Sequence, residues 1–216
     1  MLTKSIQNVN LFKIYDEAAQ RTYYGCDQEW YKRKWQRLSG CGPTAVSNIV
    51  YYLNRTHTDS VPDDSPLTKS DCVSLMEEVW RYVTPTLRGI PSTKMLYHDV
   101  LDYAKAKALN LQLDVIDIPE KQLLRPEFSR ILSFLDLALS NNTLVAFLNL
   151  NNGTEKQLDS WHWVTIISLE YAEDASAAFI HFLDEGGIKK IDLVQWFRTT
   201  TLGGGFVSIG LADSPA

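Results

Sequence analysis

Long hydrophobic runs are missing from this 216-residue sequence, and so is an excess of positive charge. No apolar stretch reaches the length of about 20 residues that a helix needs to cross a bilayer. The 21 Lys and Arg are outnumbered by 26 Asp and Glu, which gives a formal net charge of −5. Nucleic-acid binding depends on clustered cations, and the longest basic cluster here is Lys32-Arg33-Lys34. We therefore expect neither a nucleic-acid partner nor a membrane partner.

Cysteine is also scarce. The three cysteines, Cys26, Cys41 and Cys72, are odd in number and lack C-x-x-C spacing, so we expect no disulfide framework and no zinc site. Residues 1–8 lack the apolar core of a signal peptide, which indicates a cytoplasmic protein, or a secreted one if a signal has been removed. We expect no cofactor, and nothing in the sequence fixes the oligomeric state.

The order of the periodic segments predicts an α+β fold. Length and a hydrophobic content of 45% suit a single domain, residues 1–216. Apolar residues at helical spacing, with one short strand at 111–118, predict a helical lobe over about 1–140. The predicted helices are 43–53, 71–83, 93–109 and 128–139, and the polar segment 55–70 is predicted to be a surface loop.

From about residue 141 onward the pattern changes to β-branched and aromatic runs separated by Gly, Asn and Asp. These runs predict an antiparallel sheet over about 141–216. Helices followed by strands are typical of an α+β architecture with a cleft where the helical lobe meets the sheet. The predicted strands are 144–150, 163–171, 177–183, 188–193 and 206–211.

Cys41 is the strongest candidate for a reactive group. It stands between Gly40 and Gly42 and directly before the predicted helix, whose first turn holds Pro43. The positive end of the helix dipole favours a thiolate over a thiol, and the two glycines are expected to let a substrate backbone approach the sulfur. The alternative is a small buried cysteine before a helix.

His162 is the candidate general base. It stands at the mouth of a strongly apolar strand, where its ring is held rigidly, as a base must be. The alternative is a core histidine with satisfied hydrogen bonds. The other three histidines lack this setting, because His57 lies in the polar loop, His98 on a surface helix and His181 inside a strand.

Asp184 is the candidate third member of the site. It ends the apolar strand and precedes the turn Glu185-Gly186-Gly187. If this strand neighbours the strand of His162, the carboxylate can orient the imidazole and stabilise its protonated form. A turn residue that caps the glycine loop is the equally weighted alternative.

These motifs together resemble the papain-like superfamily of cysteine peptidases. Gly40-Cys41-Gly42-Pro43-Thr44-Ala45, then His162-Trp163-Val164, then Asp184 is similar in order and type to the bacterial family-39-like (double-glycine-type) members, over about residues 23–197. The resemblance implies a papain-like fold in which Cys41 is the nucleophile, His162 the base and Asp184 its partner. Related transporter peptidases cut after double glycine, but this sequence lacks their membrane segments, so that substrate is not implied.

The resemblance also implies a glutamine in the oxyanion hole, and two are available. Gln36 lies five residues before Cys41 (41 − 36 = 5), where six is the usual spacing. Gln28 lies in Asp27-Gln28-Glu29-Trp30, which resembles the motif of members with a longer loop. We favour Gln28, because Gln36 lies in a basic stretch where an exposed, solvated side chain is expected.

The predicted function is a thiol-dependent amide hydrolase, a cysteine peptidase that forms an acyl-enzyme on Cys41 and uses His162 to move the proton. Its expected partner is a peptide or protein substrate. Two alternatives stay open. An acyl or amide transferase uses the same Cys-His-Asp set, as transglutaminases and arylamine acetyltransferases do. A catalytically silent module would keep the peptide cleft and do no chemistry.

Overall fold

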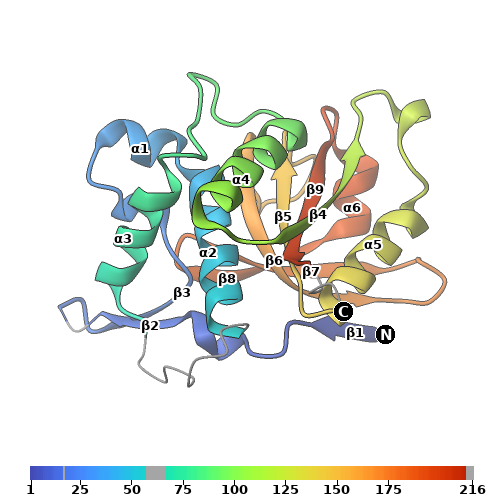
Figure 1. The fold of residues 1–216 in the computed structure, drawn as a ribbon. Coiled ribbons are helices and arrows are strands. Elements are labelled where there is room, and N and C mark those ends of the chain that lie inside the picture. Colours follow the sequence, from blue (N-terminus) through green and yellow to red (C-terminus); the bar gives the residue numbers. More distant parts are fainter. Residues whose placement is uncertain (17, 57–66, 213–216) are drawn as a thin grey trace.

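The computed structural model describes residues 1–216 except 17, 57–66 and 213–216, and has the α+β architecture that the sequence predicts (Figure 1). Its helices are α1 (Lys34–Ser39), α2 (Cys41–Thr56), α3 (Lys69–Val79), α4 (Thr93–Lys107), α5 (Phe128–Ser140) and α6 (Leu193–Thr199), with 3₁₀ turns η1 (Val9–Phe12), η2 (Gln28–Trp30) and η3 (Gln122–Leu124). Its strands are β1 (Leu2–Ser5), β2 (Lys13–Asp16), β3 (Arg21–Tyr24), β4 (Leu111–Ile118), β5 (Leu144–Asn149), β6 (His162–Tyr171), β7 (Ala178–Asp184), β8 (Gly187–Asp192) and β9 (Gly204–Leu211).

Seven strands form the main sheet, in the order β4-β9-β5-β6-β7-β8 with β1 also paired to β6. Every pairing is antiparallel. Strand β6 is long enough to serve two partners along one edge, because β5 pairs with its first half and β1 with its second half. The sheet therefore takes two strands, β1 and β4, from the first 140 residues of the chain.

Helix α2 is the centre of the helical side. Its residues Gly42 to Val50 are all buried, and it lies against β5 and β6. Figure 1 places α1, α2 and α3 on one side of the view and the sheet with α5 and α6 on the other. The apolar face of α2 and the inward faces of β5, β6 and β9 form one continuous core. This packing fixes the start of α2 relative to the start of β6.

Five helices and strands among the described residues have no counterpart among the predicted ones. They are β1, the two-stranded sheet of β2 and β3, the short helix α1, and α6. Of the predicted loop 55–70, the first two residues belong to α2, the last two belong to α3, and 57–66 lie outside the described residues.

Candidate active site

Cys41 is the first residue of α2, and only Gly40 separates it from the end of α1. A Cβ on Gly40 would lie 2.4 Å from the backbone oxygen of Gln36 and 2.6 Å from the Tyr31 ring. A Cβ on Gly42 would lie 2.7 Å from Cδ1 of Ile90. The space that a side chain would need at either glycine is thus filled by other parts of the protein. Their absent side chains let this turn pack tightly.

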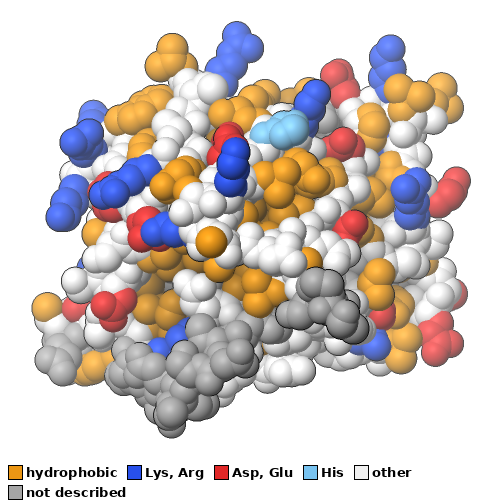
Figure 2. Space-filling model, viewed as in Figure 1, with side chains coloured by type: hydrophobic (Ala, Val, Ile, Leu, Met, Phe, Trp, Pro, Cys, Tyr) orange, Lys and Arg blue, Asp and Glu red, His pale blue; other side chains and the backbone are white. Residues whose placement is uncertain are grey.

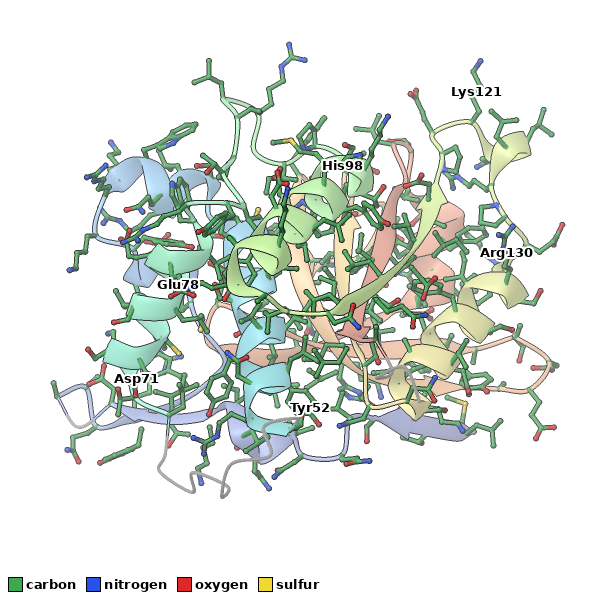
Figure 3. The ribbon with its side chains drawn as sticks, in the orientation of Figure 1. Tyr52, Asp71, Glu78, His98, Lys121 and Arg130 are labelled. Atoms are coloured by element: carbon green, nitrogen blue, oxygen red, sulfur yellow. The ribbon has the colours of Figure 1, made fainter. Side chains whose placement is uncertain are left out.

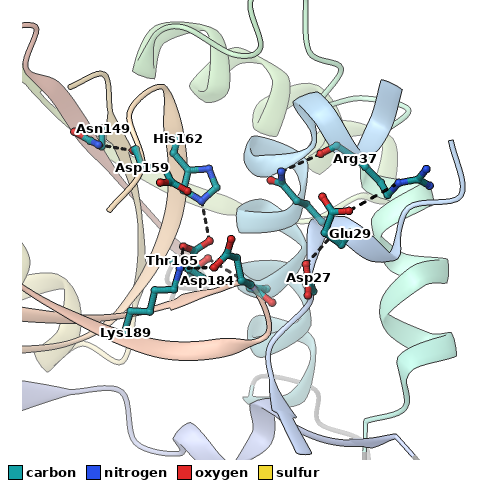
Figure 4. Close-up of polar contacts among 12 residues, drawn as sticks. Asp27, Glu29, Arg37, Asn149, Asp159, His162, Thr165, Asp184 and Lys189 are labelled. Atoms are coloured by element: carbon teal, nitrogen blue, oxygen red, sulfur yellow. Dashed lines mark hydrogen bonds and ion pairs between the residues drawn. The ribbon is translucent and has the colours of Figure 1, made fainter. Parts of the chain in front are cut away.

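His162 and Asp184 meet at the ends of two neighbouring antiparallel strands. His162 is the first residue of β6 and Asp184 the last of β7, so both side chains leave the sheet at the same edge. Nε2 of His162 lies 2.7 Å from Oδ1 of Asp184 (Figure 4). The two side chains are only 13% and 6% exposed. This contact leaves Nδ1 as the ring nitrogen available to Cys41.

Burial, the bond between its two members, and the neighbours Cys41 and Lys189 set the charge of this pair. Burial by itself lowers the pKa of His162, but the hydrogen bond with Asp184 and the nearby Cys41 sulfur outweigh it and raise that pKa to about 10. Burial raises the pKa of Asp184, but its bonds to His162 and Lys189 outweigh it and lower that pKa. Nζ of Lys189 lies 2.8 Å from Oδ2 of Asp184 (Figure 4). The site therefore favours an imidazolium beside the sulfur at neutral pH.

The raised pKa of His162 predicts how stability depends on pH. Because the folded pKa of about 10 lies above the ordinary value of 6.5, the protonated ring stabilises the fold fully below about pH 6.5 and this contribution is lost as the pH rises through about 10. We expect the difference in unfolding free energy between the wild type and His162→Gln to shrink over that window. Denaturant unfolding at a series of pH values measures it. A difference that stays constant or grows would contradict the assignment.

Gln28 lies at the site and Gln36 does not. Gln28, Cys41 and Asp184 line one small cavity of about 10 Å³, which has room for about one water. Nε2 of Gln28 donates to the backbone oxygen of Arg37 at 3.0 Å, which fixes the amide and leaves its second hydrogen for another acceptor.

Gln36 is only 4% exposed, so the expectation of a solvated side chain is wrong. Its amide donates to Glu77 of α3 at 2.9 Å, and its side-chain oxygen accepts from the backbone N–H of Arg33 at 3.3 Å. The first bond holds α1 against α3, and the second caps the start of α1, so both polar atoms of the Gln36 amide have partners. The side chain thus has a structural partner of its own.

Asn48 is a site residue that the sequence reasoning missed. Its side-chain oxygen accepts from the backbone N–H of Cys26 at 2.8 Å, and its amide lies 3.5 Å from the hydroxyl of Thr165. That hydroxyl donates to the backbone oxygen of Ala45 at 3.2 Å. Asn48 therefore ties α2, β6 and the segment before Gln28 together, and it lines the same small cavity as the candidate residues Cys41 and Asp184. The signal in the sequence is an amide on the apolar face of a helix, seven residues after Cys41.

The other histidines lie away from the candidate site. His98 is exposed on α4 (Figure 3), and His181 lies inside β7 with its ring 3.8 Å from Glu170. His57 falls outside the described residues. In the part of the chain that the structure describes, no three or more His, Cys, Asp or Glu side chains gather in a way that would hold a metal. No described helix is long and apolar enough to cross a membrane.

Comparison with known proteins identifies the fold. No protein-family model matches the sequence, and no curated protein matches it. Among solved structures, the chain is similar to UfSP from C. elegans, which has a papain-like fold, with a TM-score of 0.53 at 11% identity. The match covers 100% of this chain and 35% of UfSP, so the chain spans about a third of that protein's length. The papain-like fold implied by the sequence motifs is confirmed, and the bacterial family-39-like subtype finds no support in this comparison.

Proposed function

We propose that this protein is a cysteine peptidase of the papain-like class. One observation carries the proposal: His162 and Asp184 are hydrogen-bonded at 2.7 Å, and the unused nitrogen of His162 is left for the cysteine that heads α2. The three side chains come from positions 41, 162 and 184, which the fold brings together. The fold shared with UfSP, a cysteine protease, supports the same class. Membership of the family-39-like group is a finer proposal that rests on the motif 40–45.

The geometry supports an acyl-enzyme mechanism. His162 holds the proton of Cys41, the sulfur attacks the substrate carbonyl carbon as a thiolate, and His162 then delivers that proton to the departing amine as the C–N bond breaks. Water then attacks the thioester, with His162 as its base, and frees the acid and the sulfur. Asp184 holds the ring with Nε2–H pointing at its carboxylate, which keeps Nδ1 available for the proton. Gln28 and the backbone N–H of Cys41 are proposed to stabilise the oxyanion.

The buried His162-Asp184 pair favours an enzyme over a silent binding module, and a product analysis decides between hydrolysis and acyl transfer. Burying a His-Asp pair costs desolvation free energy. An enzyme uses such a pair in its chemistry, whereas a silent binding module gains nothing from it. Acyl transfer requires the same three residues and differs only in the attacking group. Incubating the protein with a peptide substrate and a primary amine, and weighing the products, separates the free acid from the amide. If only the amide is formed, the protein is a transferase and the hydrolase assignment is wrong.

The proposed function predicts that Cys41 is the one reactive thiol. Cys41 is half-buried at a helix start beside His162, whereas Cys26 and Cys72 are 2% and 0% exposed. At about pH 6 we expect iodoacetamide to label Cys41 at least about tenfold faster than the other two, because only a thiolate reacts. Peptide mass spectrometry over a time course measures the three rates. Equal labelling, or faster labelling of Cys26 or Cys72, would remove Cys41 as the nucleophile.

A further inference from the structure

A groove of about 560 Å³ opens beside Cys41. Its walls come from three segments: Trp35 and Leu38 of α1, Leu87 and Arg88 of the loop before α4, and Trp161 before β6. Four of these are large apolar side chains with high exposure, 42% for Trp35, 70% for Leu38, 92% for Leu87 and 56% for Trp161. Apolar side chains gathered on a surface cost free energy in water and mark binding sites. Here they surround the proposed nucleophile.

The walls of the groove are held in place by specific bonds. Thr86 and Gly89 exchange backbone hydrogen bonds of 2.9 and 3.0 Å, which closes a tight turn with Leu87 and Arg88 at its tip. The indole N–H of Trp163 donates to the backbone oxygen of Ile90 at 2.8 Å, so this turn is anchored to β6 one residue after His162. Hydrophobic and basic side chains lie side by side at the upper edge of the space-filling view (Figure 2).

Trp161 occupies an unfavourable backbone conformation. Its φ of 58° lies in the left-handed region, which large side chains rarely adopt. Neighbouring His162 is the candidate base, so the strained residue adjoins the site. A strained, exposed tryptophan contributes little to folding, and such outliers cluster where a ligand is held. The conformation places the indole in the wall of the groove.

Arg88 is the only charged residue in the lining of the groove. Among the described residues, no carboxylate forms an ion pair with its guanidinium. A guanidinium at the rim of an apolar groove attracts a carboxylate and repels a cation. The groove is therefore lined mainly by apolar side chains, with the positive charge of Arg88 at its rim.

We propose that this groove binds the substrate and selects peptides that carry a large apolar or aromatic side chain next to a carboxylate. The inference rests on the proposed peptidase function, because continuity with Cys41 makes the groove part of the same site. Its volume falls within the range of about 300–1,000 Å³ that suits a ligand of a few residues. The apolar side chain fills the space between the two tryptophans, and the carboxylate pairs with Arg88.

The test is cleavage-site profiling with the full chain and a peptide library made by digesting a bacterial proteome. Aligned cleavage sites show preferences on both sides of the broken bond. We expect enrichment of aromatic and large aliphatic residues at one position and of Asp or Glu beside it. Two synthetic peptides that differ only in carrying Asp or Lys at that position are then compared. The wild type should cleave the Asp peptide about fivefold to tenfold faster, and Arg88→Glu should cleave the Lys peptide faster by a similar factor.

Trp161→Gly keeps the test independent of folding. Glycine tolerates the left-handed conformation, so the thermal midpoint should stay the same or rise while the aromatic preference falls by about tenfold. Leu123→Ala is the matched control, because Leu123 is 99% exposed in η3 and lies outside the groove. This control should leave both preferences unchanged.

Each failure has its own signature. Cleavage without the expected preference, or a preference unaltered in Arg88→Glu and Trp161→Gly, would overturn the groove assignment and leave the peptidase intact. No cleavage by the wild type of any peptide would overturn the proposed function and this inference with it. Sedimentation of the same samples tests whether a second copy of the chain fills the groove instead. A dimer that dissociates in Leu38→Asp would assign the groove to that copy and overturn the inference.

Discussion

Replacing His162 with alanine is expected to lower kcat/KM by at least about 10⁴-fold, because the proton from Cys41 then has no acceptor and the leaving amine no donor. The same change removes the protonated ring that stabilises the thiolate. Alkylation of Cys41 by iodoacetamide should therefore slow at neutral pH and recover only at higher pH. Initial rates of peptide cleavage and of alkylation, both taken over about pH 5–9, measure the two effects.

Two variants serve as controls for this result. His181→Ala changes the same residue type on the neighbouring strand, where the ring lies 3.8 Å from Glu170 and takes no part in the site, and it should leave both rates unaltered. Asp184→Asn keeps a hydrogen-bond acceptor beside Nε2 but removes the charge, so its loss should be smaller than that of His162→Ala. An alkylation profile of His162→Ala identical to that of the wild type would mean that the two side chains do not act together.

The sequence pattern predicts the elements that bury a regular apolar stripe. The strand at 111–118 has the same bounds in the structure as in the prediction, and β5 to β9 each lie within one or two residues of the expected runs. Asn142 ends the segment after α5 in the left-handed conformation, with φ of 57°, as its side chain allows. Cys41, His162 and Asp184 could be selected from the sequence because each is the first or last residue of such a regular element.

Elements that depend on distant partners could not be predicted in this way. Strand β1 has four residues and no buried side chain, so its place follows from pairing with β6, about 165 residues later. Helix α6 has seven residues and directly continues a strand, although its Trp196 is fully buried and bonds to Asn149. Local periodicity carries no information on such contacts.

Gln36 illustrates the same limit at the level of one side chain. Its neighbours in the sequence are basic and aromatic, which predicts exposure, yet the short helix α1 turns it toward Glu77. That partner lies 41 residues away in the sequence (77 − 36 = 41) and on another helix. The sequence motif favours Gln28 for a reason unrelated to its contacts, and in the structure its amide bonds to the backbone of Arg37 and lines the same cavity as Cys41.

The second large effect is expected at Gln28. Removing one oxyanion donor typically lowers kcat by about 10²–10³-fold, because the donor acts on charge that appears only in the transition state. Gln28→Ala should show this loss with little change in KM, and Cys41 should still react readily with iodoacetamide, since the thiolate does not depend on the amide. Steady-state kinetics on one peptide substrate, with alkylation rates measured in parallel, separates the two properties.

Gln36→Ala is the matched control, because it removes the same side chain eight residues further along. The buried amide of Gln36 bonds to Glu77, so its loss leaves a carboxylate without its partner and should lower the thermal midpoint while kcat at moderate temperature stays within about threefold. The two variants therefore separate an effect on rate from an effect on stability.

A rate loss in Gln36→Ala with none in Gln28→Ala would move the oxyanion role to Gln36. Unchanged rates in both would assign the oxyanion role to the backbone N–H groups of the first turn of α2, which have no partner within the helix.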